Sequence, residues 1–158
     1  MNQFLGIYLN DQLALGVTWR ELAKRAARNN RGSEFEAPLA EVAAAIAADV
    51  ETFRGIMASL GVRPNPVKVG LAVAGERLGR FKPNGRLTSY SPLSRFMELE
   101  VLAMGIDGKK VLWSTLRDGA ALGSRLPSVD FDRLLDRAAE QRSLVEPPRL
   151  HAAREAFG

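Results

Sequence analysis

The feature that most constrains the fold of this chain is the recurrence of apolar residues at steps of three and four. It is clearest between residues 39 and 60, where the apolar positions are Leu39, Val42, Ile46, Val50, Phe53, Met57 and Leu60. An α-helix has 3.6 residues per turn, so this spacing gathers apolar side chains on one face. The segment is therefore predicted to be an amphipathic helix that packs against other helices.

The same spacing predicts helices at about residues 2–28, 34–60, 66–81, 92–117 and 130–157. The apolar stripe of the first is Phe4, Tyr8, Leu15 and Leu22, widened by Leu5, Leu9, Leu13 and Val17. The stripe of the third is Val67, Leu71, Ala74, Leu78 and Phe81. Ser33 and Glu36 have the spacing of a capping box, and Gly61 suits a left-handed helix end. Asn65 and Ser91 are each followed by a proline, as is typical of a capped helix start. Pro147 and Pro148 predict a break in the last helix.

Residues 92–117 allow two interpretations. Gly105 and Gly108 suggest a turn between two strands of a hairpin. However, the helical spacing continues through Leu99, Ile106 and Trp113, and a helix tolerates each glycine at a cost of about 1 kcal/mol. We therefore expect one long helix here and a loop at residues 118–128.

Long helices with short connections pack antiparallel as a bundle. The chain has 158 residues, enough for one domain with a core of its own. The expected fold is all-α, a single antiparallel bundle of about five helices spanning residues 1–158.

The sequence lacks the residues that several kinds of metal site and catalytic site require. There is no cysteine, and the only histidine is His151. Metal sites in helical bundles use inward-facing Glu and Glu-x-x-His, and no glutamate here has a histidine three residues later. We expect no metal, no cofactor and no enzymatic activity. Without cysteines, an N-terminal signal or an apolar run long enough to span a membrane, the chain is expected to be cytoplasmic.

Polar residues within the apolar patterns are the candidate site residues. Asp11 interrupts the stripe of the first helix, so it either faces a rim or is buried with a partner, because an unpaired buried carboxylate is costly. Arg95 and Lys109 are the expected partners, with Glu98 and Tyr90 nearby in the pattern. These residues form either a polar link that fixes helix register or a binding site.

The net charge of +4 is unevenly distributed, with two basic blocks flanking an acidic segment. If the first and third helices run parallel, both blocks lie at one pole. Such a patch would bind polyanions weakly and without sequence preference, although no nucleic-acid-binding motif accompanies it. Its residues are Lys24, Arg25, Arg28, Arg31, Arg77, Arg80, Lys82 and Arg86.

Two stretches, residues 5–11 and residues 84–100, resemble a family of small, uncharacterised bacterial all-helical proteins. The resemblance covers nearly the whole chain. It implies a ferritin-like bundle shape without ferritin chemistry, and it implies no catalytic residues.

The leading hypothesis is a non-enzymatic helical bundle that acts through binding or assembly. The apolar residues of the first helix exceed one face, and surplus apolar surface marks a partner site, so a homodimer is expected. The first alternative is a degenerate ferritin-like bundle that binds a small molecule or lipid between its helices. The second is weak polyanion binding by the basic pole.

Overall fold

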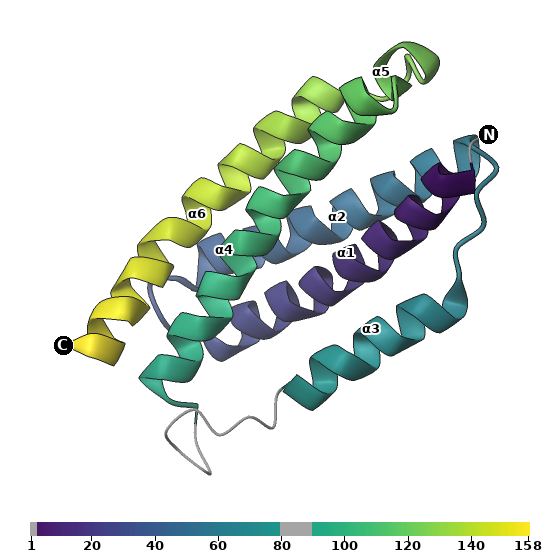
Figure 1. The fold of residues 1–158 in the computed structure, drawn as a ribbon. Coiled ribbons are helices and arrows are strands. Elements are labelled where there is room, and N and C mark those ends of the chain that lie inside the picture. The colour runs from purple at the N-terminus through teal and green to yellow at the C-terminus, as the bar shows by residue number, and fades with distance from the viewer. Residues whose placement is uncertain (1–2, 80–89) are drawn as a thin grey trace.

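The computed structural model describes residues 3–79 and 90–158, and every regular element in these ranges is helical (Figure 1). The all-α fold predicted from the sequence is confirmed. The elements are α1 (Gln3–Asn29), α2 (Glu36–Ser59), α3 (Pro66–Gly79), α4 (Pro92–Ser114), the π-helical turn η1 (Thr115–Gly119), α5 (Leu122–Arg125) and α6 (Phe131–Phe157). No helix among the described residues is both long enough and apolar enough to cross a membrane.

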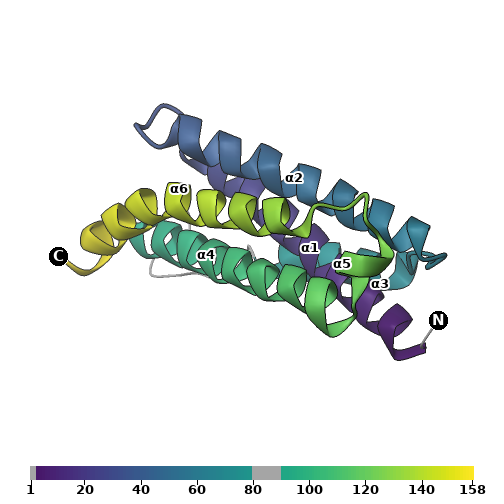
Figure 2. The ribbon, with the colours of Figure 1, turned by 90° about the horizontal axis from the view of Figure 1, so that it is seen from above.

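Two helical hairpins make up most of the molecule. Helices α1 and α2 run antiparallel as one pair, α4 and α6 form the other, and the second pair crosses the first at an angle (Figures 1 and 2). Helix α3 packs on α1 and runs in the same direction as α1 (Figure 1).

The buried apolar residues form two clusters at opposite ends of the long helices. One includes Leu9, Phe53 and Trp113, and the other includes Leu22 and Leu99. On α2 the second cluster ends at residue 46 and the first begins at residue 50; on α4 the corresponding limits are residues 106 and 112. The centre of the bundle therefore lies between two separate apolar cores.

Most helix ends follow the predicted capping chemistry. The Asn65 carboxamide oxygen accepts hydrogen bonds from the backbone amides of Val67 and Lys68, and the Ser91 hydroxyl accepts one from the amide of Ser94 at 3.0 Å. Gly61 has a φ of +69°, which L side chains rarely adopt, and ends α2 as expected.

The start of α2 differs from the prediction. The helix begins at Glu36, two residues later than expected, and Ser33 and Glu36 do not form the reciprocal capping box. Instead the Ser33 hydroxyl accepts from the amide of Phe35 at 3.2 Å, and the Glu36 carboxylate accepts from the amide of Gly32 at 2.7 Å. The carboxylate thus stabilises the turn before the helix.

Residues 92–114 form one uninterrupted helix, so the hairpin alternative is wrong. The predicted loop at residues 118–128 is partly wrong, because η1 and the short α5 occupy part of it. Ala121, between them, has a φ of +52°, and this left-handed residue turns the chain from one to the other.

The predicted break in the last helix is also wrong. Helix α6 runs from residue 131 to residue 157 with Pro147 and Pro148 inside it. Pro148 is buried, and Val145 and Ala152 on either side belong to the core. The packing of this face on the rest of the bundle holds the helix together across the two prolines.

Two apolar stripes are buried only in part. On α1, Phe4 and Leu15 are exposed, whereas Leu22 of the same stripe is buried, Tyr8 packs on the core, and Leu9 and Leu13 beside the stripe are core residues. On α3, the predicted stripe contains Val67 and Leu71, which are both about two-thirds exposed at 66% and 69%. The predicted members of that stripe at residues 78 and 81 lie outside the described side chains.

Candidate binding pocket

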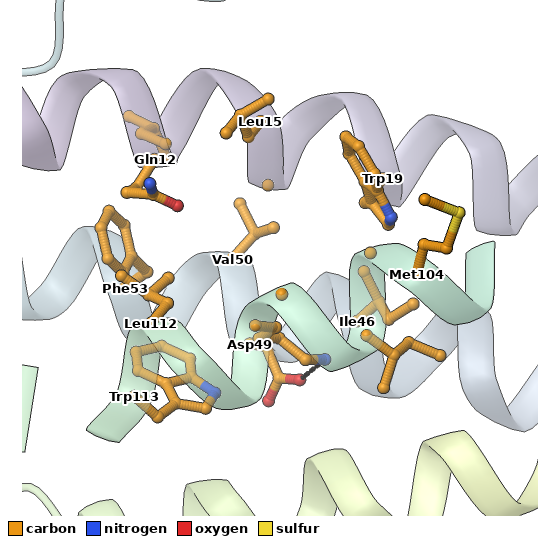
Figure 3. Close-up of a pocket in the computed structure, with 16 residues that line it drawn as sticks. Gln12, Leu15, Trp19, Ile46, Asp49, Val50, Phe53, Met104, Leu112 and Trp113 are labelled. Carbon is orange, nitrogen blue, oxygen red and sulfur yellow. Dashed lines mark hydrogen bonds and ion pairs between the residues drawn. The ribbon is translucent and has the colours of Figure 1, made fainter. Parts of the chain in front are cut away.

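A pocket of about 380 Å³ lies between α1, α2 and α4, where the two hairpins cross (Figure 3). Its walls are mainly apolar and aromatic, and its charged lining residues are one aspartate and one lysine. The lining comprises Gln12, Leu13, Leu15, Gly16 and Trp19 of α1, Ile46, Asp49, Val50 and Phe53 of α2, and Met104, Gly105, Ile106, Gly108, Lys109, Leu112 and Trp113 of α4.

Trp19 lies directly against the backbone of α4. Its indole nitrogen donates a hydrogen bond to the backbone carbonyl of Val101 at 3.2 Å. A β-carbon built on Gly105 would lie only 0.9 Å from that nitrogen, so the indole occupies the space that a side chain at residue 105 would need. The glycine thus allows α1 and α4 to approach closely at one edge of the pocket.

A polar layer, defined as Asp49, Lys109, Arg137 and Gln141, connects α2, α4 and α6 at the pocket. The Lys109 ammonium lies 2.5 Å from Asp49 Oδ2 and also donates to the side-chain oxygen of Gln141. Gln141 donates to the same aspartate oxygen at 2.9 Å, and Arg137 Nη2 lies 2.9 Å from Asp49 Oδ1. The layer lies between the two apolar cores and joins three helices.

The groups of this layer are largely removed from water. The side chains of Asp49 and Lys109 are only 2% and 14% exposed. Burial lowers the pKa of Lys109 from its usual range; the Asp49 carboxylate opposes this effect, and the positive charge of Arg137 adds to it. The contact with Asp49 is therefore what mainly keeps the ammonium of Lys109 in its charged form.

Both tryptophans of the chain line the pocket. Trp113 is buried, and its indole nitrogen has no hydrogen-bond partner among the described residues. A buried donor without an acceptor is costly, and the side chains around the pocket leave this indole N–H without one.

A second polar cluster lies near the start of α4, outside the pocket. Glu98 is buried, and its carboxylate lies 2.5 Å from Arg25 Nε and accepts hydrogen bonds from the Asn29 amide and the Tyr90 hydroxyl. Arg95 stacks over the Tyr90 ring at 5.7 Å and lies 3.0 Å from a carboxylate oxygen of Glu155. Burial and then the charge of Glu98 raise the pKa of Tyr90.

The structure thus brings together three of the five predicted polar candidates, Tyr90, Arg95 and Glu98. Lys109 belongs to the separate polar layer. The prediction that Asp11 is buried is wrong: its side chain is 53% exposed, and its carboxylate lies 2.5 Å from the ammonium of Lys68 in α3. Neither Arg95 nor Lys109 contacts it.

The predicted basic patch is described only in part. Lys24, Arg28 and Arg31 are exposed, whereas Arg25 is committed to Glu98. Arg77 lies in α3 but its side chain is not described, and Arg80, Lys82 and Arg86 fall outside the described residues. The merging of the two basic blocks stays a prediction.

The remaining polar groups offer no metal centre in the part of the chain that the structure describes, where no three of its histidines, aspartates and glutamates lie close enough to hold an ion. His151 contacts the Phe35 ring edge-on, with 5.1 Å between ring centroids, and lies 3.5 Å from Glu155. It connects α6 to the turn before α2.

Asp49, Arg137 and Gln141 were not among the residues predicted from the sequence. For Asp49 and Gln141, the apolar pattern around them gave an indication. Asp49 lies three residues after Ile46 on an apolar stripe, and Gln141 lies three residues after Ala138 on another. Polar residues at core positions of two helices point to a shared contact, but only the fold shows that they meet Lys109.

The chain has no match among family models, curated proteins or solved structures.

Proposed function

We propose that this chain is a non-enzymatic helical bundle that acts by binding, and that it holds a small, largely apolar molecule in the pocket between α1, α2 and α4. The observation that carries the proposal is the pocket itself, with its apolar walls and the charged pair Asp49 and Lys109 at one side. Ligand sites commonly combine such walls with a few polar groups that orient the occupant.

The size of the pocket argues against a simple packing fault. Protein interiors are close-packed, and the share of one liquid water is only about 30 Å³. A pocket of about 380 Å³ falls in the range of roughly 300–1,000 Å³ that is typical of small-molecule sites. The apolar walls forgo contacts that an apolar occupant would restore.

A ferritin-like bundle shape and a cytoplasmic location belong to the same proposal. The two antiparallel hairpins support the bundle shape, and the lack of cysteines fits a reducing compartment (Figure 1). The polar layer of Asp49, Lys109, Arg137 and Gln141 takes the central position between the helices.

Tryptophan fluorescence tests the proposal directly, because the only two tryptophans line the pocket. We expect 1-decanol, a neutral apolar probe, to change the emission in a saturable way. Gly108→Leu should weaken this binding by about tenfold or more, since residue 108 lines the pocket and its β-carbon position is open.

Gly55→Leu is the matched control. Gly55 is also a helical glycine with open space at its β-carbon, but it does not line the pocket. This variant should bind decanol like the unchanged protein. Equal affinity of Gly108→Leu and Gly55→Leu, or no saturable change in emission, would contradict the proposed function.

A specific observation also favours the predicted homodimer. An exposed face of α4 that borders the pocket carries apolar residues at alternating steps of four and three: Met97, Val101, Met104 and Val111, with Gly108 completing the series. This is the spacing of a coiled-coil seam, and exposed apolar stripes of this kind suit a partner helix. Met104 and Gly108 also line the pocket. Assembly through this α4 seam is the second candidate function.

A further inference from the structure

The charges of the polar layer do not balance. Lys109 and Arg137 bring two positive charges to the single negative charge of Asp49, and no second carboxylate contacts the layer among the described residues. Asp49 and Lys109 are shielded from water, with exposed fractions of 2% and 14%, whereas Arg137 is partly exposed at 26%. An unbalanced charge in such surroundings is costly.

The hydrogen-bonding capacity left at the pocket includes donors on Lys109 and Trp113 and one acceptor, Asp49 Oδ1, which forms an ion pair with Arg137 Nη2 at 2.9 Å but no hydrogen bond among the described residues. A lysine ammonium has three hydrogens, and Asp49 and Gln141 accept two of those of Lys109. The Trp113 indole N–H has no acceptor among the described residues. Lys109 and Trp113 both line the pocket, whereas Arg137 and Gln141 reach the layer from α6 behind it.

We propose that the occupant of the pocket is an apolar monocarboxylate, whose carboxylate lies beside Lys109 and whose apolar body lies against the walls formed by α1, α2 and α4. This inference rests on the proposed function and specifies its ligand. The bound carboxylate supplies the missing negative charge and accepts from the ammonium. Charge-assisted hydrogen bonds of this kind are about twice as strong as neutral ones.

The titration behaviour of Lys109 agrees with this geometry. Burial and the charge of Arg137 both lower the pKa of its ammonium, and only Asp49 opposes them. A bound carboxylate adds a second negative neighbour and stabilises the charged form. A neutral or cationic ligand offers no such compensation.

The test compares ligands that share an apolar body and differ in the head group. Decanoate, 1-decanol and decylamine are titrated below the concentrations at which they form micelles, with tryptophan emission and calorimetry as readouts. 4-Butylbenzoate, an aromatic acid, distinguishes a flexible alkyl occupant from a rigid one. At least one of the two acids should bind about tenfold or more tightly than decanol, and decylamine should bind most weakly.

Two variants of the layer should change acid binding in opposite directions. Lys109→Met removes the ammonium and should weaken decanoate binding by about tenfold or more. Asp49→Asn keeps the shape and the contact with Lys109 but removes the competing negative charge, so decanoate binding should tighten severalfold at a pH below the pKa of Lys109, which Asp49 then no longer raises. The readout in both variants is the ratio of decanoate affinity to decanol affinity, because a general change of the pocket alters both affinities together and leaves their ratio unchanged.

The outcomes separate the two proposals. If decanol and decanoate bind equally well and respond alike to both variants, the pocket binds by apolar contact and the carboxylate inference is wrong. Tighter binding of decylamine than of decanoate also overturns the inference. If no ligand changes the emission, the proposed function fails with it. Should Lys109→Met not fold, as judged by circular dichroism, Asp49→Asn decides: weaker or unchanged decanoate binding relative to decanol contradicts the inference.

Discussion

Gly105 and Gly108 lie three residues apart in α4, yet a methyl group at each would meet very different surroundings. At residue 105 it would collide with the Trp19 indole, whereas at residue 108 it would meet no atom within 4 Å. Both positions are helical, so alanine is favoured over glycine by about 1 kcal/mol in each case. The difference between the effects of alanine at residues 105 and 108 on the free energy of unfolding therefore measures the contact with Trp19.

We expect Gly108→Ala to raise the free energy of unfolding by about 0.5–1 kcal/mol and Gly105→Ala to lower it by about 1–3 kcal/mol. The second change displaces Trp19 and its hydrogen bond to Val101. Urea unfolding followed by circular dichroism measures both. Equal stabilisation by the two variants would show that Trp19 does not lie against α4.

At the scale of single residues, only part of the candidate site could be predicted from the sequence. Lys109 stands out because it interrupts an apolar stripe, and the burial of Leu102, Ile106 and Trp113 in that stripe is as predicted. Asp11 interrupts a stripe too, but it faces solvent. The two cases differ only in which apolar face the fold buries, and this depends on contacts between helices that lie far apart in sequence.

At the scale of the elements, α6 shows how packing overrides a local signal. A proline inside a helix lacks the N–H that would bond to the preceding turn, and its ring crowds the carbonyl four residues earlier. Pro147 is exposed, so its ring contributes little packing, whereas Pro148 is buried. Burial of the ring therefore offsets part of the cost of Pro148 in the helix, but little of the cost of Pro147.

We expect Pro147→Ala to raise the free energy of unfolding by about 1–3 kcal/mol, because it restores a helical hydrogen bond without removing buried surface. Pro148→Ala, the comparison variant, should gain less since it also removes a buried ring. Thermal unfolding of both variants gives the comparison. A loss of stability in Pro147→Ala would contradict this expectation.

Helix positions were more predictable than helix faces. Caps such as Asn65 and Ser91 are local chemistry, so the sequence places them correctly. Helix α3 has apolar residues on both sides, with Val69 and Val73 packed on the core and Val67 and Leu71 exposed. When two faces are similarly apolar, periodicity alone cannot select the buried one, and neighbouring helices decide.

At the scale of the whole molecule, the α4 seam is the strongest indication of assembly. Val111 is 65% exposed and lies on this seam without lining the pocket. We expect light scattering to give twice the mass of the chain at micromolar concentration, and Val111→Glu to give the mass of one chain, because a carboxylate in an apolar helix contact is costly.

Leu150→Glu is the control, since Leu150 is also an exposed apolar residue, at 41%, but lies on α6 away from the α4 seam. This variant should keep the doubled mass. A single-chain mass for the unchanged protein would contradict the homodimer, and loss of the doubled mass in Leu150→Glu alone would place the contact on α6.

The polar layer also has a consequence for how this chain can vary through evolution. Replacing a whole buried ionic group by apolar residues of similar volume is often neutral or stabilising, whereas removing one partner commonly costs 3–5 kcal/mol. Substitution at one of residues 49, 109, 137 and 141 is therefore disfavoured, while simultaneous replacement of all four is open. Descendants of this sequence should keep these four residues together or lose them together, and lineages that lost them should also have lost the binding for which the charges were retained.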